Sequence, residues 1–279
     1  MAERAEREFK VRRVVLALDP ASDVARVLRE AAALAARLNA ELAAVFVEDE
    51  DIYRSAALPF VRCFDPGATD WRNFDVTEMA REIRRIERAA QRTLAELAAQ
   101  LRLQWSFDVV RGQAERDLFA ATDENDLWLM CGNAAALAEK LTARAERAMA
   151  ASASVFMLGA RPPLSRSIVV VYDGSDAGRR ALAAAYALAP ERAMTILVVG
   201  AAPAAGAQLA KQAEAIVRAL GGRGQAIALA QGDLAHISAI AERHGGDTVL
   251  VLPASLAELQ AGRAGAALAR LRLGLLLVR

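Results

Sequence analysis

Ile168–Leu182 reads IVVVYDGSDAGRRAL, and this stretch decides the fold of the chain. Its opening run, through Tyr172, is apolar or aromatic and mostly β-branched, which is typical of a strand that is buried on both faces. Asp173 and Gly174 then end the strand in a tight turn, and Ser175 is placed to cap a helix. The stretch therefore predicts a strand–turn–helix unit with a carboxylate at the carboxyl end of its strand.

A second copy of this unit stands near the start of the chain. Val14–Leu18 has the same apolar character, and Asp19, Pro20 and Ser22 precede a helix that runs through Leu38. The difference in residue number between corresponding positions of the two copies is nearly constant along the first part of the repeat and nearly constant again, at a smaller value, along the rest. This pattern indicates a duplicated domain with a single change of length. The offsets are 154 for Asp173 against Asp19, 152 for Val199 against Val47, 120 for Gly232 against Gly112, 121 for Asp247 against Asp126, and 120 for Leu275 against Val155.

The predicted fold class is α/β, with two tandem Rossmann-like domains, each a five-stranded parallel sheet flanked by helices. A chain of 279 residues has room for two domains of about 140 residues, each with its own core. The first domain spans residues 1–160 and the second spans residues 167–279. A linker over residues 161–166 contains two adjacent prolines, which favour extended chain. We expect two separate sheets that superpose on each other.

Charge and composition exclude several classes of protein. With 35 basic and 34 acidic residues, no global field draws the chain to nucleic acid or to an anionic membrane. The arginines of 81–92 interleave with Glu at helical spacing and are interpreted as a solvated helix face. No stretch is a membrane span, and the N-terminus is too charged for a signal peptide. Two cysteines, Cys63 and Cys131, form no framework and fit a reduced, cytoplasmic compartment.

The order of five strands and four helices resembles a universal stress protein domain. Asp follows the first strand, Gly precedes the third helix, and Asp opens the fourth strand. The most specific stretch is VVVYDGSDAGRRAL (169–182), and DLWLMCGN (126–133) and DTVLVLPAS (247–255) support it. The resemblance covers nearly the whole chain as two tandem copies. It implies that the halves pair about a pseudo-twofold axis, so that one chain mimics a dimer and two chains can associate into a further homodimer.

The phosphate-binding loop of that family is missing. In its nucleotide-binding branch, the Asp after the first strand lies at the ligand, and a G-x2-G-x9-G-[ST] loop after the fourth strand wraps the phosphates with backbone N–H groups. Asp19 and Asp173 match the first feature. However, no glycine lies between Gly132 and Gly159, and Gly262–Gly265 falls where a helix should already begin. Neither half is expected to hold a triphosphate in the family's manner.

Candidate ligand-binding residues follow from the carboxyl ends of the strands at the point where strand order reverses. For Asp19 and Asp173, helix capping and ligand contact remain open as alternatives, whereas Ser22 and Ser175 are interpreted as helix caps. His236 and His244 are interpreted as surface or capping residues rather than a metal pair, and Cys131 as a packed thiol. The candidates are Asp19, Gly112, Gly132 and Asn133 in the first half, and Asp173, Gly174, Ser175 and Gly232 in the second.

The predicted function is that of a non-catalytic stress-response protein, acting through an unidentified protein partner or a small ligand. No catalytic constellation and no metal site is visible in the sequence, and no cofactor is expected. The alternative is a stress switch that binds ATP or AMP. Glu48–Phe74 has no counterpart in the second half and is predicted to be irregular. Its apolar residues Ile52, Leu58, Pro59 and Phe60 favour burial over disorder, so we expect the segment to carry partner contacts, with a lid packed on its own domain as the alternative.

Overall fold

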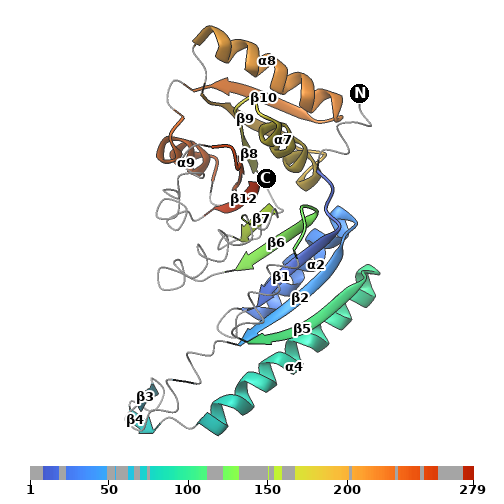
Figure 1. The fold of residues 1–279 in the computed structure, drawn as a ribbon, viewed down its shortest axis with the longest axis vertical. Helices are drawn as coiled ribbons and strands as arrows, with labels where there is room; N and C mark the ends of the chain where they lie inside the picture. The colour runs from blue at the N-terminus through green and yellow to red at the C-terminus, as the bar shows by residue number, and fades with distance from the viewer. Residues whose placement is uncertain are drawn as a thin grey trace.

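The computed structural model describes residues 9–18, 23–48, 54, 62–65, 70–73, 76–111, 122–131, 150, 154–158, 167–200, 203–229, 232–245, 248–256 and 273–279. These residues form an α/β fold (Figure 1), as the sequence predicts. The elements are β1 (Arg13–Leu18), α2 (Val24–Leu38), β2 (Glu41–Glu48), β3 (Arg62–Asp65), β4 (Asp70–Asn73), α4 (Val76–Leu101), β5 (Trp105–Arg111), β6 (Asp126–Cys131), β7 (Ser154–Leu158), β8 (Ser167–Tyr172), α7 (Asp176–Leu188), β9 (Ala193–Val198), α8 (Pro203–Ala219), β10 (Arg223–Ala228), α9 (Leu234–Arg243), β11 (Thr248–Pro253) and β12 (Gly274–Val278).

The main sheet is one continuous ten-stranded sheet, which corrects the expectation of two separate sheets. Its strand order is β10-β9-β8-β11-β12-β7-β6-β1-β2-β5. All neighbouring strands are parallel except β12 and β7, which pair antiparallel in the middle. Both central strands are apolar, and pairing them removes two sheet edges that would otherwise expose unpaired backbone groups.

Strand pairings in the first half match those in the second half when a fixed number is added to the residue numbers of each strand. Val14 pairs with Leu42 between β1 and β2, and Ile168 pairs with Met194 between β8 and β9. These pairs are related by 168 − 14 = 154 and 194 − 42 = 152, the offsets read from the sequence. For β6 and β11 the sequence offset of 121, taken from Asp126 and Asp247, is one residue smaller than the shift that the strand pairing gives. Leu127 pairs with Ser154 and Val249 with Gly274, so the β6-to-β11 shift is 249 − 127 = 122, and the buried Asp126 corresponds to Thr248.

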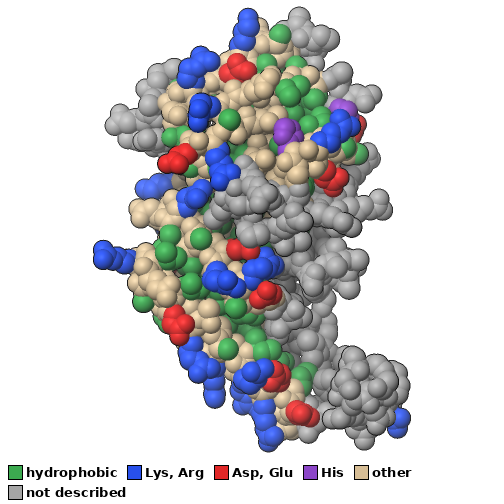
Figure 2. Space-filling model, turned by 180° about the vertical axis from the view of Figure 1, so that it is seen from behind, with side chains coloured by type: hydrophobic (Ala, Val, Ile, Leu, Met, Phe, Trp, Pro, Cys, Tyr) green, Lys and Arg blue, Asp and Glu red, His purple; other side chains and the backbone are tan. Residues whose placement is uncertain are grey.

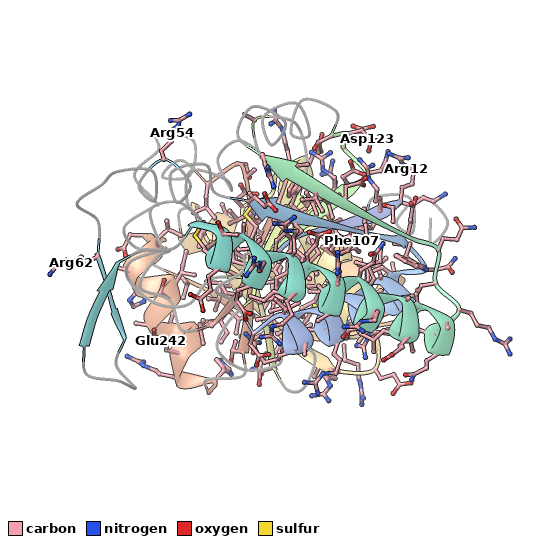
Figure 3. The ribbon with its side chains drawn as sticks, turned by 90° about the horizontal axis from the view of Figure 1, so that it is seen from below. Arg12, Arg54, Arg62, Phe107, Asp123 and Glu242 are labelled. Atoms are coloured by element: carbon pink, nitrogen blue, oxygen red, sulfur yellow. The ribbon has the colours of Figure 1, made fainter. Side chains whose placement is uncertain are left out.

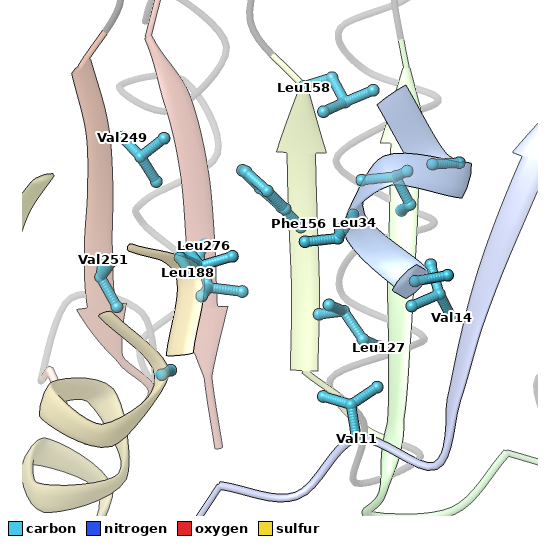
Figure 4. Close-up of a cluster of buried hydrophobic side chains, with 14 of the residues drawn as sticks. Val11, Val14, Leu34, Leu127, Phe156, Leu158, Leu188, Val249, Val251 and Leu276 are labelled. Carbon is cyan, nitrogen blue, oxygen red and sulfur yellow. The ribbon is translucent and has the colours of Figure 1, made fainter. Parts of the chain in front are cut away.

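The junction between β7 and β12 is symmetric in register. Phe156 pairs with Leu276, and these two residues are themselves related by 276 − 156 = 120. The flanking pairs are Leu275 with Met157 and Leu277 with Val155. Adding 120 to Val155 and Met157 gives Leu275 and Leu277, so the same shift turns one flanking pair into the other. A local twofold axis therefore passes through the Phe156–Leu276 pair, whose side chains lie on the same side of the sheet in Figure 4.

Helices α2, α4, α7 and α8 cover one face of the sheet, and α9 packs on the other. On the first face a single cluster of buried side chains runs across the junction, from Phe46 and Leu94 on one side to Val198 and Val217 on the other. The carboxyl ends of α2 and α7 meet there, where the Arg37 guanidinium donates a hydrogen bond to the Leu188 carbonyl. Because the apolar core is continuous, the two halves are expected to unfold together.

Local signals set the helix ends. Ser175 caps α7, as predicted, because its hydroxyl oxygen accepts a hydrogen bond from the Gly178 amide. The prediction for Ser22 is wrong, since the N-cap of α2 is Asp23, whose carboxylate accepts from the Arg26 amide. A carboxylate offers a stronger acceptor than a hydroxyl at a helix N-terminus. The helix α2 ends at Asn39, which adopts the left-handed conformation with φ 50°.

Part of Glu48–Phe74 is regular, contrary to the prediction. Strands β3 and β4 form a separate two-stranded antiparallel sheet, with Arg62 opposite Asn73 and Asp65 opposite Asp70. In Figure 1 this hairpin lies away from the main sheet, next to the start of α4. Ile52, Leu58, Pro59 and Phe60 lie outside the described residues, so the prediction of partner contacts stays a prediction. In the described part of the chain, no helix has both the length and the apolar character required to cross a membrane.

We expect Leu276→Ala, in the second half, to lower the free energy of unfolding of the first half as well. Truncation of a buried Leu costs about 2–5 kcal/mol. The three tryptophans, Trp71, Trp105 and Trp128, all precede the junction, so their fluorescence reports on the first half. Urea unfolding followed by tryptophan fluorescence should shift together with unfolding followed by circular dichroism. Ile227→Ala is the control, since Ile227 is exposed on the edge strand β10. A fluorescence transition that is unchanged in Leu276→Ala would contradict a shared core.

Candidate functional site

The predicted site is described only in the second half. Asp19, Gly112, Gly132 and Asn133 lie outside the described residues. In the second half the strand order reverses between β8 and β11, because β9 and β10 extend the sheet one way and β12 extends it the other. The carboxyl ends of β8 and β11 are therefore side by side, and Asp173 and Ser255 follow them. This is the place at which open α/β sheets bind ligands.

Three polar side chains converge at this point. The Ser175 hydroxyl donates to Asp173 Oδ1 over 2.6 Å, and the Ser175 amide donates to the same oxygen over 3.0 Å. The Ser255 hydroxyl donates to the other carboxylate oxygen, Asp173 Oδ2. Ser255 lies 82 positions from Asp173 in the sequence. The loop after β11 is thereby tied to the loop after β8 by a charge-assisted hydrogen bond, which is stronger than one between neutral groups.

Counting protons shows how the three groups share their hydrogen bonds. Ser175 Oγ and Ser255 Oγ lie 2.9 Å apart, and each hydroxyl carries a single proton. Both protons are used when each hydroxyl donates to Asp173, so the contact between the two hydroxyl oxygens then holds no proton. Ser175 Oγ also accepts from the Gly178 amide over 2.9 Å. The carboxylate is thus bound by groups of the protein itself on both of its oxygens.

These contacts resolve part of the open question about Asp173. The helix is capped by Ser175, with φ −78° and ψ 171°, and the carboxylate of Asp173 orients that cap rather than capping the helix itself. Gly178 is required at its position because a Cβ there would lie 2.5 Å from Asp173 Oδ1. Sequence reasoning missed Gly178 and Ser255. A glycine in the first turn of a helix is unfavourable by itself, and this was the available signal for Gly178.

The two predicted glycines have packing roles. Gly174 has φ +82°, and a Cβ there would lie 3.0 Å from Leu209 Cδ2 of α8. Gly232 precedes α9, and a Cβ there would lie 2.8 Å from the Cβ of Val199 at the end of β9. The structure therefore places Gly232 against β9, whereas Asp173, Ser175 and Ser255 form one group.

Histidine and cysteine add no second site among the described residues. His236 and His244 are both exposed, and His244 is the C-cap of α9, in agreement with their interpretation as surface or capping residues. The side chain of Cys131 lies outside the described residues. Within the described ranges, no group of three or more His, Cys, Asp or Glu side chains could hold a metal ion.

The environment of Asp173 lowers the pKa of its carboxyl group. Partial burial by itself raises this pKa, but the hydrogen bonds from the Ser175 hydroxyl, the Ser255 hydroxyl and the Ser175 amide together outweigh it. The ionised form is therefore favoured in the folded protein, where it holds the β8 and β11 loops together.

Comparison of the chain with known protein families and with curated proteins found no match. The geometry of the site is therefore the ground on which a function is assigned.

We expect Asp173→Asn to flatten part of the acid unfolding profile. Because the pKa of Asp173 is lowered on folding, the stability that its ionised form contributes is complete above the unfolded value of 3.8 and is lost as the pH falls through the folded pKa. The melting temperature of the wild type should therefore exceed that of Asp173→Asn near pH 6, and the difference should shrink towards about pH 2.

The variant Ser255→Ala serves as the comparison for this measurement. It removes one donor and so raises the folded pKa of Asp173 towards the unfolded value, so the loss of stability on acidification should be smaller than in the wild type and should end at a higher pH. A difference between wild type and Asp173→Asn that stays constant across the acid range would contradict the role of the carboxylate.

Proposed function

We propose that this chain is a two-domain relative of the universal stress proteins, a non-catalytic cytoplasmic protein that acts through protein partners or a small ligand. The observation that carries the proposal is the closed group of Asp173, Ser175 and Ser255, which stands where an open α/β sheet binds its ligand. A catalytic role is disfavoured because the lowered pKa of Asp173 makes its carboxylate a weak base towards both hydroxyls, and because Ser175 Oγ already accepts from the Gly178 amide as the cap of α7.

The two domains are residues 1–160 and 167–279, joined by residues 161–166. The corresponding strand orders, the shifts of 154 and 152 between registers, and the symmetric β7–β12 pairing support this division. In this arrangement the halves form a pseudo-dimer within one chain. The outer edges of the sheet, β5 and β10, remain for association with a second chain as a homodimer.

The proposal disfavours ATP binding in the manner of the family. A triphosphate needs several N–H donors that are free to reach it, and transfer of its charges from water without them is costly. At the described site, the Ser175 amide and the Gly178 amide are both used within the protein. The alternative, a switch that binds ATP or AMP, requires the Ser255 hydrogen bond to Asp173 to open.

Calorimetric titration with Mg-ATP tests this choice. We expect an affinity no tighter than roughly the high micromolar range, which corresponds to about −5 to −6 kcal/mol. Titration with AMP under the same conditions should give an equally weak result. A low-micromolar site in the wild type that disappears in Asp173→Ala would contradict the proposal and favour the nucleotide switch.

The outer face of α4 has the chemistry of a partner surface. Arg81, Arg84, Arg85, Arg88 and Arg92 are all exposed there, as predicted for a solvated face, and with Gln91 they line a hollow of about 750 Å3. At about 100° per residue, these arginines share one side of the helix, and Glu78, Glu82, Glu87 and Glu96 lie outside that side. Figure 2 shows the cationic side chains gathered at the lower end of the molecule, where Figure 1 places α4.

The second half shows that the fold does not require this cationic face. Helix α8 lies between β9 and β10 as α4 lies between β2 and β5, yet it carries only Lys211 and Arg218 as basic residues. A nucleic-acid strand is disfavoured as the partner because α4 has no aromatic residue on which bases could stack. Two like-charged copies of α4 would repel each other. An acidic segment of another protein therefore fits this face best.

Charge reversal on α4 should remove acidic partners. Arg81 and Arg88 take part in no side-chain hydrogen bond or ion pair in the described structure, so Arg81→Glu with Arg88→Glu should leave the fold intact. Immobilised wild type and variant would be incubated with the same cell extract, and the captured proteins quantified by mass spectrometry. Lys211→Glu with Arg218→Glu on α8 is the matched control. We expect acidic proteins to be lost only from the α4 variant; an unchanged set would contradict the assignment.

A further inference from the structure

A cleft of about 500 Å3 lies where the two halves of the chain meet. Because β7 and β12 run antiparallel, the starts of the first-half strands lie beside the carboxyl ends of the second-half strands. The segment before β1, the turn before β6 and the start of β7 form one side of the cleft. The first turns of α7 and the residue after β12 form the other. Asp173, Ser175 and Ser255 are not among its lining residues, so this cleft is separate from the group that these residues form at the carboxyl ends of β8 and β11.

Most acidic groups in the cleft are already neutralised. Asp126 is nearly fully buried and accepts two hydrogen bonds from the Arg13 guanidinium, over 3.1 Å and 2.5 Å. Arg12 adds a contact of 3.5 Å to Asp126 and bonds Asp123 over 2.7 Å, and Figure 3 shows Arg12 beside Asp123. Asp176 is paired with Arg179. Glu124, which is exposed, is the remaining acidic side chain in the described lining.

Two cations in the same cleft have no partner among the described residues. Neither Lys10 nor Arg180 takes part in a hydrogen bond or an ion pair. Moreover, the Nε atom of Arg180 is buried without an acceptor. A buried donor without an acceptor is unfavourable, by about 1–3 kcal/mol for a typical group and by more for a charged one. Lys10 and Arg180 come from opposite halves, so only the assembled chain brings them together.

At the corresponding position of the first half, the arginine is paired with an acidic side chain of the same helix. The shift of 154 that relates β1 to β8 also relates the buried faces of α2 and α7, for example Leu28 to Leu182 and Leu34 to Leu188. Under this shift Arg26 corresponds to Arg180 and Glu30 corresponds to Ala184. Arg26 bonds Glu30 over 2.8 Å. In α7 the acidic partner is replaced by a buried alanine, which leaves Arg180 unpaired.

We propose that this cleft binds a small polar molecule that carries a phosphate or carboxylate group, with Arg180 and Lys10 as its anion-binding residues. The planar guanidinium of Arg180 can donate two parallel hydrogen bonds to such a group, and Lys10 adds a mobile positive charge. The rest of the polar lining, Glu124, Asn125 and Ser154, offers acceptors and donors to hydroxyl or amine groups of the same molecule. The volume lies within the range that small-molecule sites occupy.

Calorimetric titration of the full chain at low salt tests the proposal, with inorganic pyrophosphate and citrate as separate probes. We expect one site per chain for at least one probe. Arg180→Gln should weaken its binding at least tenfold, and Lys10→Gln by a smaller factor. Arg26→Gln is the matched control at the corresponding position and should leave binding unchanged. Because Arg180 is unpaired, Arg180→Gln should not lower the melting temperature.

The two probes distinguish the sources of the anionic group. Binding of pyrophosphate alone identifies a phosphorylated ligand, binding of citrate alone identifies a carboxylate, and binding of both supports the shared oxyanion chemistry. Binding of neither probe, or equal binding by wild type and Arg180→Gln, overturns the proposal. Arg180→Lys, which keeps the charge but loses the planar fork, should bind with intermediate affinity. An affinity equal to that of Arg180→Gln would show that the fork is required.

Discussion

The antiparallel pairing of β7 with β12 is the contact on which the rest of the structure depends. It joins strands that are otherwise all parallel into one ten-stranded sheet, and its register places Phe156 opposite Leu276 on a local twofold axis. An exposed edge of a flat apolar strand is prone to pair with other chains, and this junction covers two such edges at once. The same pairing lets one apolar core run from α4 to α8 and opens the cleft between the halves.

A second constraint acts at the carboxyl ends of β8 and β11. Here a carboxylate, two hydroxyls and two backbone amides bind one another, and glycine at position 178 makes the close approach possible. Hydrogen bonds of this kind hold the loops in one arrangement, and they occupy the donors that an anionic ligand would need. The group therefore stands where open α/β sheets bind ligands, but its hydrogen bonds are those of a structural junction.

Related backbones in the two halves carry different side chains, and these differences point to function. The arginine face of α4 has no counterpart on α8, and the Arg26–Glu30 pair of α2 becomes an unpaired Arg180 beside Ala184 in α7. The fold tolerates either version, since both helices pack on the sheet in the same way. Charges that packing does not require can serve the contacts that we propose, with an acidic partner at α4 and with an anionic ligand at Arg180.

The sequence by itself determined the strands of the main sheet, the α/β class, the repeat offsets of 154 and 152, and the Ser175 cap, because each depends on neighbouring residues or on a pattern repeated along the chain. Only the tertiary structure decided that the sheets join into one and that Ser255 reaches Asp173 from 82 positions away. It also decided that Lys10 and Arg180 share a cleft. These contacts depend on which strand edges and loops meet in space, and side chains far apart in sequence carry no local signal of such a meeting.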